Sequence, residues 1–139
     1  MAVARYLADT SVINRLSKPP VYQRMEPLIM AGLVAVCAMV ELEVLYSAQS
    51  PGEYRELRED LKGFELLPMP DEVWDTAREV QASLATKSQH RSAKLPDLLI
   101  AAAAARHQVT VLHYDKDYDS IAAVTGQPAE WVVPPGTAD

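Results

Sequence analysis

Short apolar runs alternate with amphipathic stretches along most of the chain, a pattern typical of alternating strands and helices. Runs of β-capable residues predict strands at 3–8, 33–37, 64–67, 109–113 and 130–133. Helical spacing predicts a helix starting near residue 10, with others at 21–31, 38–50, 53–62, 70–85, 96–105 and 115–123. Strands that alternate with helices indicate an α/β fold. We expect a central, mainly parallel sheet of four to five strands, flanked by helices.

Length and composition narrow this picture. The chain has 139 residues, 49% of them hydrophobic, so we expect residues 1–139 to form a single domain. The apolar stretch 28–40, interrupted by Gly32, is shorter than the ~20 residues that a membrane helix needs. Asp9 interrupts the N-terminus before a secretory signal can form, and the single Cys37 suits a reducing compartment. We therefore expect a cytoplasmic protein with no membrane segment.

Acidic residues recur where predicted strands end or helices begin. Asp9 follows the first strand, and Asp115 and Asp117 follow the fourth. Glu41 lies near the start of the helix after the second strand, and Asp97 opens the helix that leads into the fourth. Right-handed crossovers place all of these positions at the carboxyl edge of the sheet, where ligands bind in such folds. We expect this set to share a pocket: Asp9, Glu41, Asp97, Asp115 and Asp117.

Helix geometry indicates which of two nearby acids, Glu41 or Glu43, faces the pocket. At about 100° per residue, Glu41 lies at the margin of a face centred on Ala38 and Leu42, whereas Glu43 lies nearer solvent. We therefore predict that Glu41 points inward and that Glu43 is a solvated surface charge. Asp119 is likewise predicted at the surface.

The four aspartates also have purely structural explanations, which the sequence leaves open. Asp9 can be a helix N-cap with no further role, and Asp97 can be present only because a negative charge in the first turn stabilises a helix dipole. Asp115 and Asp117 suit a turn. The functional alternative is that they bind a cation, because two unit charges ~4 Å apart repel by ~4 kcal/mol at an effective dielectric near 20.

The residue types decide which cation to expect. Carboxylates and water suit a hard divalent ion, Mg²⁺ or Mn²⁺, which can hold a phosphate oxygen and activate water. Zinc is disfavoured because the histidines lack ligand spacing and Cys37 is alone. The basic loop 87–94, with Arg91 and Lys94, ends just before Asp97 and can guide a phosphate backbone, or can simply be solvated. The net charge of −6 argues against broad nonspecific nucleic-acid binding.

Four segments carry a resemblance to a known family. In order and spacing, residues 7–11, 39–42, 95–102 and 112–119 resemble the PIN domain, and more narrowly the VapC ribonuclease toxins of prokaryotic toxin–antitoxin pairs. The resemblance covers nearly the whole chain. It implies an Mg²⁺-dependent endoribonuclease that cuts RNA, is usually a homodimer, and is neutralised by a VapB-like antitoxin whose tail covers the acidic pocket.

The resemblance also assigns roles to residues. It implies that Asp9 and Asp97 hold the metal, that Glu41 and Asp115 complete an acidic quartet, and that Asp117 is a further acid of the site.

Smaller groups of the pocket follow from the same resemblance. Thr10 or Ser11 matches the small polar residue beside the first acid. The family commonly has Thr two residues before the fourth acid. His113 stands there instead, which puts a hydroxyl role at that position in doubt.

Other classes fit less well. A phosphoryl-accepting receiver domain needs paired acids after its first strand, and a haloacid-dehalogenase phosphatase needs a second Asp two residues after Asp9, where Ser11 stands. The remaining alternative is a non-catalytic PIN-like module that only binds partners, against which the presence of all four acids argues.

Overall fold

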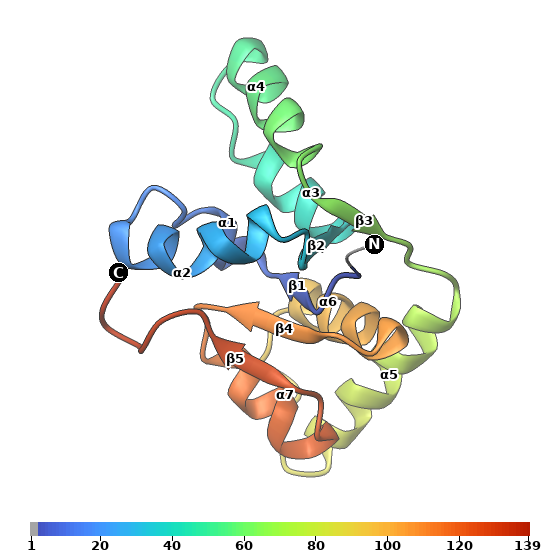
Figure 1. The fold of residues 1–139 in the computed structure, drawn as a ribbon. Coiled ribbons are helices and arrows are strands. Elements are labelled where there is room, and N and C mark those ends of the chain that lie inside the picture. Colours follow the sequence, from blue (N-terminus) through green and yellow to red (C-terminus); the bar gives the residue numbers. More distant parts are fainter. Residues whose placement is uncertain (1–2) are drawn as a thin grey trace.

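The computed structural model describes residues 3–139, which form a parallel five-stranded sheet with helices packed around it (Figure 1). The strands are β1 (Tyr6–Ala8), β2 (Val34–Cys37), β3 (Glu65–Leu67), β4 (Thr110–His113) and β5 (Ala129–Trp131). The helices are α1 (Thr10–Ile13), α2 (Pro19–Met30), α3 (Ala38–Tyr46), α4 (Pro51–Leu61), α5 (Glu72–Ala85), α6 (Leu95–His107) and α7 (Asp117–Thr125). The strand order is β3-β2-β1-β4-β5 and each neighbouring pair is parallel, which confirms the predicted fold class.

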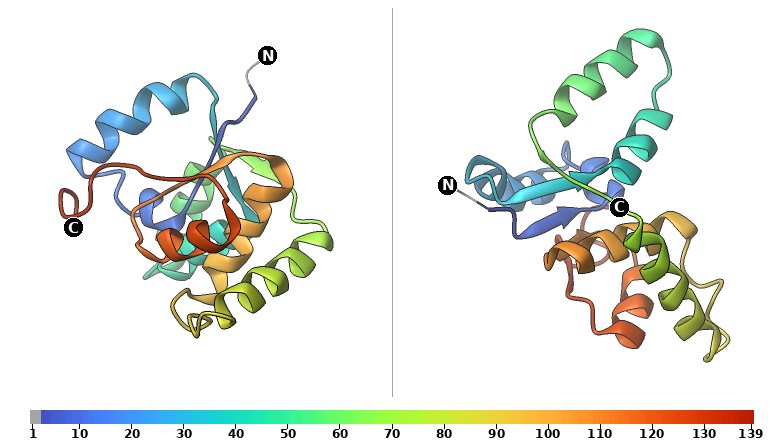
Figure 2. Two further views of the ribbon diagram at one scale, coloured as in Figure 1. Left: turned by 90° about the horizontal axis from the view of Figure 1, so that it is seen from below. Right: turned by 90° about the vertical axis from the view of Figure 1, so that its right-hand side faces the viewer.

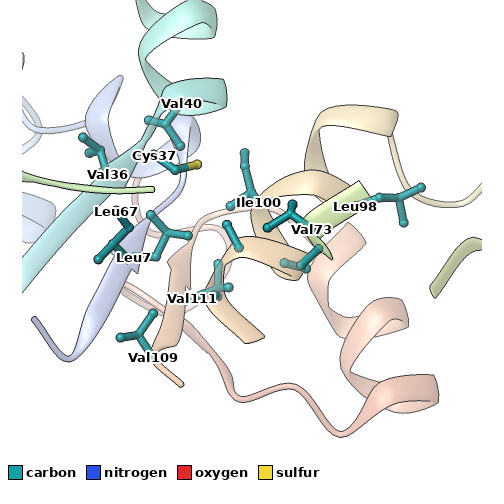
Figure 3. Packing of buried hydrophobic residues seen from close by; sticks show 14 of the residues in the cluster. Leu7, Val36, Cys37, Val40, Leu67, Val73, Leu98, Ile100, Val109 and Val111 are labelled. Atoms are coloured by element: carbon teal, nitrogen blue, oxygen red, sulfur yellow. The ribbon is translucent and has the colours of Figure 1, made fainter. Parts of the chain in front are cut away.

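The central strands are buried on both faces, which explains their continuous apolar runs. Successive residues of β1 point to opposite faces: Leu7 packs in one hydrophobic cluster and Ala8 in another. Figure 3 shows Leu7 and Val111 beside Ile100 of α6 in the larger cluster. In the right-hand view of Figure 2, α5, α6 and α7 gather on one side of the strands, while α4 projects away on the other.

The helix boundaries around residue 50 differ from the prediction. We expected one helix over 38–50 that Pro51 terminates, but α3 ends at Tyr46 and Pro51 is the first residue of α4. Ser50 is the N-cap of α4, and its hydroxyl accepts a hydrogen bond from the Glu53 amide at 3.1 Å. Proline suits the first helical position because its missing N–H has no partner there in any case.

This topology sets up the site. β1, β2 and β4 run parallel, so the residues after Ala8, Cys37 and His113 meet at one edge of the sheet. The N-terminus of α6 reaches the same edge. Cys37 is fully buried as a free thiol, as predicted. Within residues 3–139, none of the helices combines the length and apolar character needed to cross a bilayer.

Candidate functional site

Asp9 lies directly after β1, where it caps a helix and also lies in the acidic pocket. Its backbone N–H donates to the Leu112 carbonyl at 2.8 Å, which fixes it beside β4. As the N-cap of α1, its Oδ2 accepts hydrogen bonds from the Ser11 amide at 3.0 Å and the Ser11 hydroxyl at 2.5 Å. The side chain is also part of the acidic pocket, because its Oδ1 accepts a hydrogen bond from Tyr118, whose hydroxyl lies beside Asp97 as well.

Tyr118 joins the two central acids, and the sequence analysis missed it. Its hydroxyl lies 2.7 Å from Asp9 Oδ1 and 3.4 Å from Asp97 Oδ1. Burial first, and then the charges of Asp9 and Asp97, raise the pKa of Tyr118 well above its ordinary value. The hydroxyl therefore stays protonated and can donate. A signal was present in the sequence: a tyrosine among the apolar positions of a helix needs a partner for its hydroxyl once it is buried.

Asp97 is more deeply buried than Asp115 and Asp117. It lies in the first turn of α6, with 5% of its side chain exposed. No group in residues 3–139 donates a hydrogen bond to Asp97 Oδ2. Burial first, and then repulsion from Asp9, raise the pKa of Asp97 to about 8. A buried carboxylate oxygen without a donor is costly, so this atom favours either a proton or a bound cation.

Asp115 and Asp117 lie across the pocket from Asp9, and both form ion pairs with Lys94. The Lys94 Nζ lies 2.8 Å from Asp115 Oδ2, 2.8 Å from Asp117 Oδ2 and 3.6 Å from Asp97 Oδ2. Burial opposes both charges, but these hydrogen bonds raise the pKa of Lys94 and lower the pKa of Asp117. Asp115 Oδ1 also accepts from the Asp117 amide at 2.9 Å, as expected for a turn. The ammonium of Lys94 therefore occupies a position that suits a cation.

His113 supports the turn that carries Asp115. Its Nδ1 accepts a hydrogen bond from the Asp115 amide at 3.2 Å, so the ring fixes the turn that carries this acid. The ring is fully buried, and burial lowers the pKa of His113. The neutral ring then carries its proton on Nε2, which has no hydrogen-bond partner within the described part of the chain.

Part of the prediction about α3 was wrong, because the helix buries a different face and Glu43 is not a solvated surface charge. Val40 and Val44 are buried and Leu42 is 63% exposed, whereas we expected Leu42 to face inward. Glu43 is half-buried rather than solvated, and its Oε1 accepts a hydrogen bond from the Thr10 hydroxyl at 2.8 Å. Partial burial raises the pKa of Glu43, and repulsion from Asp9 raises it further. The hydrogen bond from Thr10 opposes this shift only in part. Glu43 therefore faces the acids.

Glu41 lies on nearly the opposite side of α3 from Glu43, since two residues advance a helix by more than half a turn. It has no hydrogen bond or ion pair to a side chain in residues 3–139. Glu41 is nevertheless half-buried like Glu43, and its charge acts on the Cys37 thiol together with that of Asp9. Its place among the site acids stays a prediction.

The predicted substrate-positioning residues divide into two groups. Thr10 and Ser11 are engaged inside the pocket, Thr10 with Glu43 and Ser11 with Asp9 and the Tyr114 amide. Arg91 is exposed on the loop before α6 and pairs with no acid of the described chain. Asp119 is exposed as predicted.

The donor set fits a divalent metal ion. One carboxylate oxygen from each of Asp97, Asp115 and Asp117 lies within 4.8 Å of the others. The Oδ2 of Asp97 has no hydrogen-bond donor among the described residues, so a bound cation can satisfy it in place of a proton. Asp9 is connected to this group through Tyr118. Oxygen donors of this kind suit Mg²⁺ or Mn²⁺, so the cluster can hold a divalent ion.

Comparisons with known proteins point to one family. The family model of the PIN domain matches residues 6–124. Ribonuclease VapC51 of Mycobacterium tuberculosis is 50% identical over 135 residues, which cover 97% of this chain and 98% of that protein. Ribonuclease VapC21 of the same species is 48% identical over 137 residues, covering 96% and 98%. The fold also matches DNA-bound VapBC from Salmonella typhimurium, with a TM-score of 0.77, 15% identity, and 94% and 100% of the two chains covered.

Proposed function

Because the chain belongs to the VapC ribonucleases of the PIN domain family, we propose that it is a metal-dependent endoribonuclease acting as the toxin of a toxin–antitoxin pair. The observation that carries this proposal is the buried Oδ2 of Asp97, which has no hydrogen-bond donor within residues 3–139 and lies in a cluster with Asp115 and Asp117. The ion proposed is Mg²⁺, with Mn²⁺ as a substitute. When bound, such an ion supplies charge for a phosphate oxygen and a nucleophilic water for attack on phosphorus.

The chain's own groups would then have separate tasks. Asp97 and Asp9, with Asp115 and Asp117, provide the negative charge that binds the ion. Glu43 faces the acids and its pKa is raised, which suits it to accept a proton. Glu41, half-buried on the other margin of α3, is the alternative acid for this task.

Contacts to RNA would come from the rim of the pocket. Arg91 is exposed on the loop before α6, so it can meet the phosphate backbone without breaking an ion pair. Lys94 has an exposed stem, and its ammonium can turn to a phosphate when an ion displaces it from Asp115 and Asp117. Thr10 and Ser11 would support the substrate indirectly, by holding Glu43 and Asp9 in place.

The partner proposed is a VapB-like antitoxin. Structures with this fold include complexes named VapBC, such as the one from Salmonella typhimurium. The acidic cluster suits an arginine of the partner, whose planar fork pairs bidentately with carboxylates. We also propose a homodimer, supported by the exposed apolar residues Leu42 and Tyr46 of α3 and Met30 of α2.

We also propose that residues 1–139 act as one domain. The segment after β5 is tied to the residue that follows β4, because the Tyr114 hydroxyl accepts hydrogen bonds from the Gly136 amide at 2.7 Å and the Ala138 amide at 3.0 Å.

The direct test is cleavage of a fluorogenic RNA by the purified chain. We expect cleavage with Mg²⁺ or Mn²⁺, loss of cleavage in EDTA, and loss in Asp97→Asn, with Asp119→Asn as a matched control on the exposed side of α7. Undiminished cleavage in EDTA would contradict the metal mechanism.

A further inference from the structure

A separate cleft lies between α5 and the N-terminal half of α6, outside the acidic pocket. Its volume is about 150 Å³, and its apolar lining includes Trp74, Leu95, Leu98 and Leu99. At about 100° per residue, Leu95 and Leu99 lie on one side of α6 and Asp97 lies on the other. The cleft and the acids are therefore on opposite sides of the same helical turn, with Leu95 only two residues before Asp97 in the chain.

Two large apolar side chains of this cleft are exposed to solvent. Trp74 is 55% exposed and Leu95 is 66% exposed, whereas Leu98 is buried. Exposed apolar groups that share a cleft mark a place where another molecule binds, and an indole offers a flat face for a planar ring. Pockets for drug-sized molecules measure about 300–1,000 Å³, so this smaller cleft suits one planar ring rather than a larger ligand.

The charges around the cleft suit a polyanion. Arg78 lines it, and an ion pair of 2.9 Å with Arg78 compensates the charge of Asp75. The loop 86–94, which joins α5 to α6 and ends at Leu95, carries three Lys or Arg side chains and no Asp or Glu, in a chain with a net charge of −6. The last of these, Lys94, already reaches the acidic pocket. Basic side chains beside an exposed aromatic ring are the combination that binds single-stranded nucleic acid.

The separation between the cleft and the acids corresponds to a short piece of RNA. A helix with its side chains is about 10–12 Å across, so a strand that passes round the first turn of α6, from Asp97 to Leu95, covers about this distance. Stacked nucleotides of one strand lie about 3.4 Å apart, so about three nucleotides span it. A base at that spacing from the cleaved bond can therefore reach Trp74.

We propose that this cleft is a subsite for one unpaired base of the RNA, which stacks on the indole of Trp74 and packs against Leu95. The inference rests on the proposed ribonuclease function. It makes Trp74 a residue that binds the substrate without contacting the reacting atoms. It also requires the RNA to be single-stranded at this point, because proteins stack on bases that are free of a duplex.

The first experiment compares the cleavage of a fluorogenic single-stranded RNA by wild type and Trp74→Ala in Mg²⁺. A base stack binds the substrate and the transition state equally, so its loss should raise KM at least about fivefold and leave kcat within about twofold. Trp74→Phe keeps an aromatic face and should stay close to wild type. Tyr54→Ala is the matched control, since Tyr54 is 42% exposed on α4, which projects away from the other helices (Figure 2).

A shortened substrate separates base binding from a general loss of structure. It keeps the cleaved bond but lacks the nucleotides that can reach the cleft. Its KM with wild type should rise to the value for Trp74→Ala, whereas its KM with Trp74→Ala should match that of the full substrate. A structural defect would instead weaken cleavage of both substrates by the same factor.

Tryptophan fluorescence tests the subsite without cleavage. Trp131→Phe leaves Trp74 as the only tryptophan of the chain. In EDTA, a single-stranded oligoadenylate RNA should quench the Trp74 emission until it saturates. An abasic oligonucleotide of the same length carries the same phosphates without the bases, so it should not quench.

The outcomes distinguish this subsite from the proposed function. An unchanged KM in Trp74→Ala, or equal quenching by the abasic oligonucleotide, would overturn the subsite while wild-type cleavage still supports the nuclease. Loss of a dimer in Trp74→Ala, without quenching by RNA, would overturn it in favour of a contact between two copies of the chain. Wild type that cleaves no RNA would overturn the proposed function, and the fluorescence titration would then decide whether the cleft binds a base.

Discussion

Asp97→Asn should make the metal-free protein more stable, and increasingly so as the pH rises. The folded chain holds this carboxyl with a pKa of about 8, against an ordinary value of 3.8. Between these two values the unfolded chain has lost the proton that the folded chain keeps, so the free energy of unfolding falls as the pH rises. The loss is complete above pH 8. Asparagine carries no charge in either state and escapes it.

The size of the effect follows from the same shift. At about 1.4 kcal/mol per pKa unit, the full shift corresponds to about 6 kcal/mol. Asp117 shares the site, and its pKa moves downward, which offsets part of this cost. We therefore expect a stabilisation of roughly 2–4 kcal/mol at pH 8.5 and about 1 kcal/mol or less at pH 5.

The assay is urea denaturation in EDTA from pH 5 to pH 9, with Asp60→Asn on exposed α4 as a control for the same change of net charge. Excess Mg²⁺ should shrink the difference, because ion binding stabilises only the wild-type fold. Parallel curves for wild type and Asp97→Asn would refute the assignment of a buried, repelled carboxyl. A variant less stable than wild type at pH 8.5 would favour a helix-capping role instead.

Three further results are expected. Glu43→Gln should slow RNA cleavage by about tenfold or more, whereas Glu41→Gln should stay within about twofold of wild type, and the reverse order would restore our first choice of acid. Lys94→Met removes a cation from the acidic cluster, so it should tighten Mn²⁺ binding several-fold and lower the melting temperature of the metal-free protein. Weaker Mn²⁺ binding would show that the Lys94 ammonium does not compete with the ion for Asp115 and Asp117. Light scattering at tens of micromolar should give the mass of a dimer, and a monomer would count against the proposed assembly.

Much of the fold was predictable because buried parallel strands have a direct sequence signal. All residues of β2 are buried, and the run Val34–Cys37 is correspondingly apolar throughout. The boundary between α3 and α4 was not predictable from composition, because it depends on whether Pro51 ends one helix or begins the next. The Ser50 cap settles that question, and the cap is a local feature we did not weigh.

The acids after strands followed from topology, whereas side-chain orientation did not. Asp9 and Asp115 had to reach one edge once the strands were parallel. Choosing between Glu41 and Glu43 required the rotation of α3, and apolar residues lie nearly all around that helix, so its sequence does not mark the buried side. The Tyr118 hydroxyl contacts the acids only because of how α7 packs against the sheet. This packing depends on distant segments, so no short stretch of sequence predicts it.

The position of β1 in the sheet has a consequence for how the protein is made. Tyr6, near the start of the chain, pairs with Thr110 of β4, so the pairing joins segments separated by most of the sequence. Such non-local pairings form late, because a long loop must close first. During synthesis the chain emerges from its N-terminus, and Asp9 is exposed long before Asp97 and Tyr118 exist. The acidic pocket therefore cannot assemble on a nascent chain until residues as far as Tyr118 have been translated, so a shorter ribosome-bound fragment carries none of the proposed nuclease activity.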